Sequence, residues 1–303
     1  MSVVERTIRK LQEEKQAAGD ANAAQTAPQS AAQPAAAAQA PAMPLPSVAP
    51  RVRSAPIVLD RGGLRGAGLL PPEPDMKALA RQYRNIKHPL VAQAVGRGGP
   101  RVPKGHLIMI ASAMSGEGKS FTAVNLALSL ALEKDINVLL VDADVAKPQL
   151  SHVFGVGHSR GLLDALRDPA LDVESLIRPT DVPNLSFLPA GEGAEEATEL
   201  LSSSRMEQIA TYLGENDPLR VVLFDSPPLL QTTESVALAR VAGQIVVVFR
   251  AEWTPQPVLL DALKVLDGHP TVSLVLNQSQ HNSASSYYYY YGYGNERPDA
   301  GQS

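Results

Sequence analysis

Cysteine is absent from the 303 residues of this sequence. Without thiols the chain cannot be a small secreted scaffold held together by disulfides, and no cysteine can ligate zinc or an iron–sulfur cluster. An excess of either charge is also missing, because 27 Lys and Arg stand against 31 Asp and Glu, a formal net charge of −4. So small a net charge gives no reason to expect a nucleic acid partner, and we expect none.

Long apolar runs are missing as well. No run approaches the roughly 20 residues that a membrane-spanning helix needs. Residues 1–15 mix acidic and basic side chains where a signal peptide would have an apolar centre. We therefore expect a cytoplasmic location. Hydrophobic residues nevertheless make up 44% of the chain, which is enough for a substantial core in one or two domains.

The composition changes sharply along the chain and predicts four segments. Residues 21–50 contain no charged side chain, and 23 of these 30 residues are Ala, Pro or Gln, so they offer little to bury. We interpret 20–73 as a disordered linker. Before it, three apolar residues at helical spacing give 1–19 an amphipathic pattern that suits docking, although a frayed terminus would explain it equally well. A globular domain is expected at 74–280 and a flexible tail at 281–303.

Short apolar runs alternate with amphipathic stretches through the expected domain. Strands that are apolar at nearly every position are buried on both faces, and helical crossovers between them make a parallel sheet. We therefore predict an α/β fold of three layers with a mostly parallel central sheet. Pro89 should end or kink the first helix. The expected strands are 107–112, 137–142, 184–189, 220–225, 244–249 and 271–276, and the expected helices are 74–95, 119–133, 196–213, 232–241 and 255–267.

A glycine-rich sequence, AMSGEGKS at 113–120, follows the first strand directly and opens a helix. Gly116 and Gly118 allow backbone N–H groups to turn toward one point, at which the positive end of the helix is also aimed. Lys119 would reach the β- and γ-phosphates of a nucleotide, and the Ser120 hydroxyl would ligate Mg²⁺. The pattern predicts a P-loop NTPase-like fold that binds ATP and Mg²⁺, and an ordinary glycine-rich turn is the alternative. The expected cofactor contacts are Ser115, Gly116, Glu117, Gly118, Lys119, Ser120 and Phe121.

Three carboxylates follow apolar strands. Asp142 and Asp144 come at the end of the second strand, and Asp225 ends the strand 220–225. The carboxyl ends of parallel strands converge where ligands bind in such sheets, and a buried carboxylate needs a cation or hydrogen-bond donors. We therefore expect Ser120, Asp144 and Asp225 to form a Mg²⁺ site. Taken singly, each Asp could instead serve a turn or a helix cap.

Together these motifs resemble a known family. AMSGEGKS, VLLVDADVAKP and VVLFDSPP resemble the Walker A, Walker A′ and Walker B motifs of the bacterial tyrosine kinases, which are P-loop proteins related to the partition and arsenite ATPases. The resemblance begins near residue 74 and is strongest for the cytoplasmic autokinases of exopolysaccharide export. It implies ATP-dependent tyrosine autophosphorylation and a homo-oligomer. It also implies recruitment to the inner face of the cell membrane by a membrane polysaccharide co-polymerase, and reversal by a tyrosine phosphatase.

Two stretches depart from the family pattern. Two basic residues often precede the proline of the Walker A′ motif, whereas this chain has Ala146 and Lys147. An oligomerisation helix with Glu-x-x-Arg-x-x-Arg spacing is common, whereas the aligned stretch here contains Arg81, Arg84 and Lys87. Only Arg84 matches outright, because Lys87 keeps the charge but lacks the planar fork of arginine. The resemblance to the family's ring-forming helix is therefore incomplete.

Six of the eight tyrosines gather beyond the expected core. Consecutive tyrosines cannot share one face of an element, so we do not expect them in the core, and a sticky low-complexity end is the alternative. The resemblance implies that they are autophosphorylation sites. Each phosphate adds about −1.5 to −2 charges, so we expect a phosphorylated tail to leave an acidic site and to loosen an oligomer built on its docking. These tyrosines are Tyr287, Tyr288, Tyr289, Tyr290, Tyr291 and Tyr293.

The candidate catalytic residues are Lys119, Asp142, Asp144 and Asp225. Lys119 would bind phosphate, while Asp144 and Asp225 would hold the metal directly or through water. The family's Walker A′ acid implies that Asp142 accepts or orients the tyrosine proton, a part that could exchange with Asp144. Asn277, at the end of the last strand, could meet the adenine edge, and a strand-terminal turn residue is the alternative.

Two other functions fit parts of the pattern. A partition-type ATPase switch carries a signature lysine early in its loop, where this chain has Met114 and Ser115, and no basic amphipathic helix follows the core here. The second alternative is a nucleotide-sensing adaptor without kinase activity, in which the tyrosines serve only as a docking peptide. Phosphotyrosine that appears only with ATP and Mg²⁺ would distinguish a kinase from both.

Overall fold

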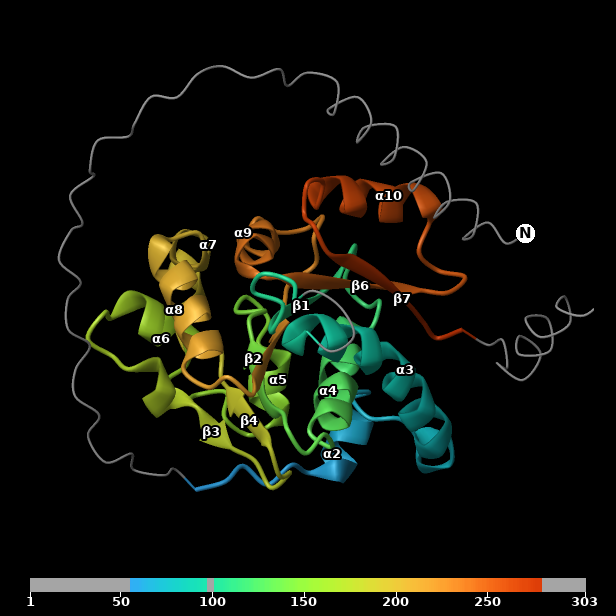
Figure 1. Ribbon diagram of the computed structural model, residues 1–303, viewed down its shortest axis with the longest axis horizontal. Coiled ribbons are helices and arrows are strands. Elements are labelled where there is room, and N and C mark those ends of the chain that lie inside the picture. The colour runs from blue at the N-terminus through green and yellow to red at the C-terminus, as the bar shows by residue number, and fades with distance from the viewer. Residues whose placement is uncertain (1–54, 97–100, 280–303) are drawn as a thin grey trace, which may run out of the picture. The chain divides into compact units, whose positions relative to one another are not determined.

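The computed structural model describes residues 55–96 and 101–279 (Figure 1). In these ranges the centre is a seven-stranded sheet in the order β3-β4-β2-β5-β1-β6-β7. Only the pairing of β3 with β4 is antiparallel, so the predicted α/β fold with a mostly parallel sheet is confirmed. The strands are β1 Leu107–Ser112, β2 Asn137–Asp142, β3 Arg178–Pro179, β4 Leu185–Leu188, β5 Arg220–Asp225, β6 Gln244–Arg250 and β7 Val272–Asn277.

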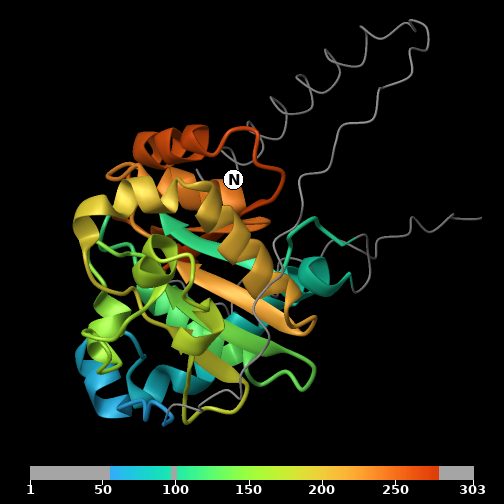
Figure 2. The ribbon, with the colours of Figure 1, turned by 90° about the vertical axis from the view of Figure 1, so that its left-hand side faces the viewer.

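Helices cover both faces of the sheet, which makes three layers (Figures 1 and 2). β1 shows the cause: Leu107 and Met109 pack into one apolar cluster, Ile108 and Ile110 pack into the other, and all four are fully buried. One face carries α2 Arg61–Gly66, α3 Met76–Val95, α4 Lys119–Leu130 and α5 Gln149–Val153. The other carries α6 Leu162–Arg167, α7 Ala197–Leu201, α8 Ser204–Glu215, α9 Glu234–Val241 and α10 Gln256–Val265.

The six predicted strands all occur, with ends that differ by at most one residue. The helix predicted at 196–213 is wrong as a single element, because α7 ends at Leu201 and α8 begins at Ser204. Ser203 makes the break: its side chain accepts a hydrogen bond from the N–H of Met206 and caps α8. None of the helices in the described ranges has both the length and the apolar character needed to cross a membrane.

The predicted linker boundary is wrong for residues 55–73, which fold against the domain. The N–H of Ile57 donates to the carbonyl of Pro179, and Leu64 and Leu69 are buried with α4 in the core. Isolated leucines among glycines gave no periodic signal, and their burial depends on partners far away in the sequence. The rest of the linker, the segment 1–19 and the tail 281–303 lie outside the described residues.

Pro89 does not end α3, which continues to Val95. Leu90 and Val91 after the proline are buried, so packing holds the last turns in place. The helix ends where Gly96 adopts a left-handed conformation with φ of 74°.

Lys87 is a buried cation that joins α3 to α4. Its Nζ donates to the carbonyl of Ser129 at 2.8 Å and lies 2.7 Å from Oε1 of Glu133. Ser129 is in the last turn of α4, so the charge also meets the negative end of that helix. Lys87 aligns with an oligomerisation position of the family, but its charge pairs with Glu133 and Ser129 of the same chain.

Replacing Lys87 with Met should lower the free energy of unfolding by about 1–3 kcal/mol. Met keeps the apolar stem but removes the hydrogen bond to Ser129 and the pairing with Glu133. Chemical denaturation measures the change. Lys264→Met is the matched control, because the exposed Lys264–Asp261 pair should contribute less than about 1 kcal/mol. Equal effects of the two substitutions would contradict the role of Lys87.

Candidate active site

The glycine-rich loop joins the inner strand β1 to α4 at the carboxyl edge of the sheet (Figure 1). α4 begins at Lys119, directly after the loop. Gly116 and Gly118 have φ of 87° and 93°, a region that glycine adopts readily. A Cβ on Gly118 would also meet Nδ2 of Asn277, so a substitution there would displace that side chain from the loop. Ser115 and Gly116 are exposed at the tip of the loop.

The fully buried carboxylate of Glu117 anchors the loop to neighbouring parts of the chain. Its Oε2 accepts from the N–H of Met114 at 2.7 Å, and its Oε1 accepts from the hydroxyl of Thr254. Its carbonyl accepts from Nδ2 of Asn277 at 2.9 Å, while Oδ1 of Asn277 accepts from the N–H of Gln278. Asn277 therefore supports the loop backbone, and its expected contact with an adenine edge stays a prediction.

The three candidate carboxylates meet beside the loop. Asp142 and Asp225 are register partners on the neighbouring strands β2 and β5. Asp144, just beyond β2, pairs with Lys119 with 3.0 Å between Oδ2 and Nζ, and the nearby Ser120 side chain lowers the pKa of Asp225. All three carboxylates are buried, none more than 7% exposed. The fold thus brings together residues that the sequence separates by about a hundred positions.

Burial and mutual repulsion set the protonation of this group. Burial raises the pKa of Asp142 to about 7, helped by the charge of Asp225 and opposed by hydrogen bonds from Ser151. Burial likewise raises the pKa of Asp225 to about 6, opposed first by the charge of Lys119. Burial alone would lower the pKa of Lys119, but the carboxylates of Asp225, Asp144 and Asp142 outweigh it and raise the pKa. One lysine among three carboxylates leaves a site that favours a further cation.

Two buried oxygens, Oδ1 of Asp142 and Oδ1 of Asp225, have no hydrogen-bond partner within the described ranges. Such atoms cost free energy unless a ligand satisfies them. Carboxylate and hydroxyl oxygens suit Mg²⁺, so the unpartnered oxygen of Asp225 fits the expected metal, whereas that of Asp142 could meet another group of the substrate. In the described part of the chain no group of three or more His, Asp or Glu could hold a metal alone. Mg²⁺ commonly binds through one or two carboxylates plus substrate phosphates, which agrees with this arrangement.

The remaining candidate, Phe121, packs its ring against the apolar cluster of the α2–α5 face. Its ring is only partly buried, and its contact with a nucleotide stays a prediction. Sequence reasoning missed two polar residues of the site, Thr254 beneath the loop and Ser151 against Asp142. Neither belongs to a recognisable spacing pattern, and each reaches the site from a separate segment.

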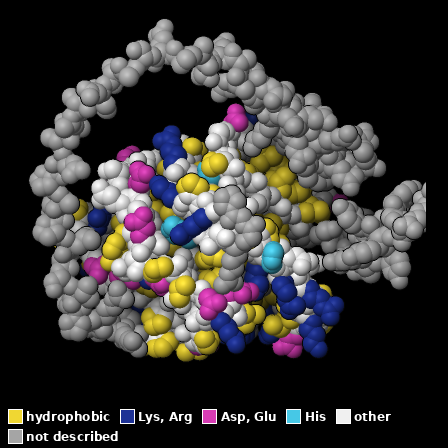
Figure 3. Space-filling view, viewed as in Figure 1, with side chains coloured by type: hydrophobic (Ala, Val, Ile, Leu, Met, Phe, Trp, Pro, Cys, Tyr) yellow, Lys and Arg dark blue, Asp and Glu magenta, His cyan; other side chains and the backbone are white. Residues whose placement is uncertain are grey.

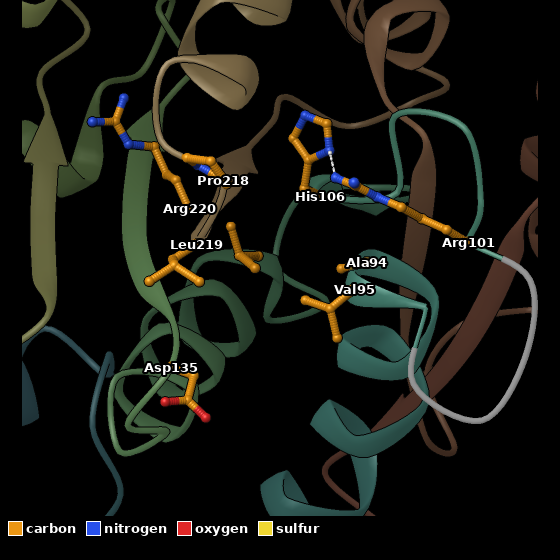
Figure 4. Close-up of a pocket in the computed structure, with 9 residues that line it drawn as sticks. Ala94, Val95, Arg101, His106, Asp135, Pro218, Leu219 and Arg220 are labelled. Atoms are coloured by element: carbon orange, nitrogen blue, oxygen red, sulfur yellow. Dashed lines mark hydrogen bonds between the residues drawn. The ribbon is translucent and has the colours of Figure 1, made fainter.

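A hollow of about 160 Å³ lies at the opposite edge of the sheet from the loop (Figure 4). It is lined by the end of α3 and the starts of β1 and β5. Nδ1 of His106 lies 3.4 Å from Nη2 of Arg101, and burial, with that charge, lowers the pKa of His106. Arg220 on its wall is paired with Glu174. None of the candidate site residues lines this hollow, so it is separate from the predicted nucleotide site.

Known proteins resemble this chain over the same region. A family model described as an AAA domain matches residues 105–256. The tyrosine-protein kinase Ptk of Acinetobacter johnsonii is 32% identical over 183 residues, 60% of this chain but 24% of that protein. The tyrosine-protein kinase YwqD of Bacillus subtilis is 33% identical over 168 residues, 55% of this chain and 67% of that protein. The crystal structure of the VpsO kinase domain matches with a TM-score of 0.56 and 29% identity, covering 69% of this chain and 100% of that chain.

These matches include relatives of very different length. The chain spans about a fifth to a quarter of the longer relatives and two thirds of YwqD. The curated relatives are tyrosine kinases, which favours a kinase over a partition-type ATPase.

Proposed function

The chain belongs to the bacterial tyrosine kinases, and from this premise we propose that it transfers the γ-phosphoryl group of ATP to tyrosines of its own C-terminal segment. The observation that carries the proposal is the Lys119–Asp144 pair, 3.0 Å apart beside the glycine-rich loop, with Asp142 and Asp225 next to it. Phosphoryl transfer is catalysed mainly by positioning and by stabilising charge. A loop that binds phosphates beside acidic groups that bind a metal is suited to both tasks.

In the proposed reaction a tyrosine oxygen bonds to the γ-phosphorus while the bond from that phosphorus to the β–γ bridging oxygen breaks, so that ADP leaves. Lys119 and the loop N–H groups bind the phosphate oxygens. Asp142, whose Oδ1 lacks a partner among the described residues, accepts or orients the tyrosine proton, a part that could exchange with Asp144. Mg²⁺, held by Ser120, Asp144 and Asp225 directly or through water, would neutralise charge on the phosphate oxygens.

The purified chain, incubated with ATP and Mg²⁺, should acquire phosphotyrosine on the six tail tyrosines at 287–291 and 293. Changing these six to Phe should abolish the signal, although Tyr83 and Tyr212 remain. Tyr83 is buried, and burial raises its pKa to about 12. Mass spectrometry before and after incubation locates the phosphates. Full phosphorylation of the Phe variant would contradict the proposal.

We propose that homo-oligomers form through α3. Lys77, Arg81 and Arg84 are exposed and lie at i, i+4 and i+7, so they make one basic face, and Figure 3 shows Lys and Arg side chains gathered over this helix. No ion pair within the described residues engages these three. An acidic surface on a second copy would complement this face.

Replacing Arg81 and Arg84 together with Glu should therefore lower the mass in solution measured by light scattering. Lys264→Glu, on exposed α10, should leave the mass unchanged. An unchanged mass in the double variant would rule out this face as the interface.

The proposed activity would regulate exopolysaccharide synthesis and export. A membrane-bound polysaccharide co-polymerase would recruit the chain to the inner face of the membrane, and a tyrosine phosphatase would reverse the modification. The amphipathic pattern of 1–19 and the uncharged 21–50 support a tethered arrangement. Comparing the membrane-bound fraction of the full chain with that of a chain lacking 1–19, with and without the co-polymerase, tests this proposal. Equal fractions in all four cases would contradict it.

A further inference from the structure

We propose that Ser151 is a positioning residue of this site, which holds one oxygen of Asp142 so that the other oxygen faces the tyrosine hydroxyl. The proposal rests on the proposed function, because it requires Asp142 to act on that hydroxyl. Ser151 lies nine residues beyond Asp142, on the short helix α5, outside the sequence motifs. Its role is indicated by the geometry of its two hydrogen bonds to Asp142.

Both donors of Ser151 converge on a single atom. Its N–H and its hydroxyl donate to Oδ2 of Asp142 at 2.8 and 2.7 Å. The two residues are buried, with Ser151 2% exposed and Asp142 0%. Oδ1 of Asp142 receives no hydrogen bond from any described residue. One oxygen of the carboxylate therefore accepts two hydrogen bonds, and the other accepts none from the described residues.

The hydroxyl of Ser151 is itself held in direction. Its oxygen accepts from the N–H of Ala190 at 3.0 Å, which leaves its proton directed at Asp142. The carbonyl of Ala190 accepts from the N–H of Leu163, so this loop is tied in turn to α6. Only Ser151 contacts Oδ2 of Asp142 directly, while the loop at Ala190 and the start of α6 hold the Ser151 hydroxyl in place behind it.

Two hydrogen-bond donors on one oxygen restrict the rotation of the Asp142 carboxylate, which a single donor would still allow. The terminal torsion of an aspartate side chain is broad and is not confined to a few staggered positions. With the backbone N–H alone, the carboxylate plane can rotate about that bond. With the hydroxyl as a second donor the plane is fixed, and Oδ1 stays in the orientation in which a proton acceptor must wait.

The full chain carrying Ser151→Ala tests the proposal. We expect kcat for tail phosphorylation to fall about ten- to a hundredfold, while the Kd of a fluorescent ATP analogue with Mg²⁺ stays within about twofold. Ser151→Thr, which retains the hydroxyl, should recover most of kcat. Ser235→Ala is the matched control, because Ser235 is equally buried but its hydroxyl donates only to the carbonyl of Thr232. That control should keep the wild-type kcat.

A double-mutant cycle shows whether Ser151 acts through Asp142. Adding Ser151→Ala to Asp142→Asn should cost no more than about twofold beyond Asp142→Asn alone, since the carboxylate is already gone. A further loss as large as that in the wild-type background would overturn the proposal. So would an unchanged kcat in Ser151→Ala, or weaker nucleotide binding that accounts for the whole loss. Absence of phosphotyrosine in the wild-type chain would instead refute the proposed function.

Discussion

Replacing Lys119 with Met should reduce tail phosphorylation by about a hundred- to a thousandfold or more. Met fills a similar volume but removes the cation that lies 3.0 Å from Asp144. The three buried carboxylates would then face an incoming triphosphate with no positive side chain among them, and like charges repel strongly where water is scarce. The substitution should therefore weaken nucleotide binding as well as the transfer step.

Anti-phosphotyrosine signal against time measures the rate, and a fluorescent ATP analogue measures binding. Lys119→Arg is an informative companion, because it keeps the charge but changes its shape and reach, and we expect it to bind nucleotide better than the Met variant while transferring slowly. Lys264→Met, which removes only the exposed ion pair with Asp261, should retain full activity. Near-wild-type phosphorylation in Lys119→Met would refute the assignment of the site.

The layers of this fold could be predicted because its strands are locally unambiguous. β1, β2 and β5 are short, almost wholly apolar runs, and their burial on both faces follows from that composition alone. The glycine-rich loop could also be predicted, since two glycines, a lysine and a serine between a strand and a helix carry their own chemistry. Placement of Asp142 and Asp225 followed from the rule that parallel strands converge at one edge.

Features that depend on partners distant in sequence escaped prediction. Lys87 reads as a surface cation until Glu133 and the end of α4 are seen beside it. The amide of Asn277 donates to the carbonyl of Glu117, 160 residues away, a contact that its place at the end of a strand does not indicate. Ser151 belongs to no motif, yet it fixes a carboxylate of the site. Each is a single polar contact between separate segments, which leaves no periodic pattern in the chain.

The difference between the features that could be predicted and those that could not has a physical cause. The burial of an apolar strand or helix face follows from the character of many consecutive residues. It can therefore be predicted from the local sequence without knowledge of distant contacts. A polar contact between two segments is set by one pair of atoms and by the path of the chain between them. The reactive part of a site is built largely from such contacts, and for that reason its supporting residues are found in the structure.

Replacing Asp225 with Asn should lower the kinase activity strongly and at the same time raise the stability of the folded chain. Asp225→Asn keeps the shape of the side chain but removes a negative charge from the metal site. We expect phosphorylation to fall about a hundredfold or more, since the metal loses a charged ligand. The variant without nucleotide should nevertheless be more stable than the wild type, by about 1–3 kcal/mol.

The gain in stability follows from the direction of the pKa shift. The folded state raises the pKa of Asp225 from its ordinary value near 3.8 to about 6, so ionisation of this residue disfavours folding. That penalty is complete above about pH 6 and vanishes below about pH 4, where the group is protonated in both states. The advantage of Asp225→Asn should therefore be largest near pH 7 and should shrink toward pH 4.

Thermal denaturation with and without ATP and Mg²⁺ separates the two effects. Ligand at a hundred times its Kd should stabilise the wild type by about 2.7 kcal/mol, and the variant should gain much less because it binds the metal–nucleotide pair poorly. Asp261→Asn, on the exposed surface, is the control and should change neither quantity. If Asp225→Asn were less stable than the wild type at pH 7, this carboxylate would be a structural group, and its high burial would need an explanation other than metal binding.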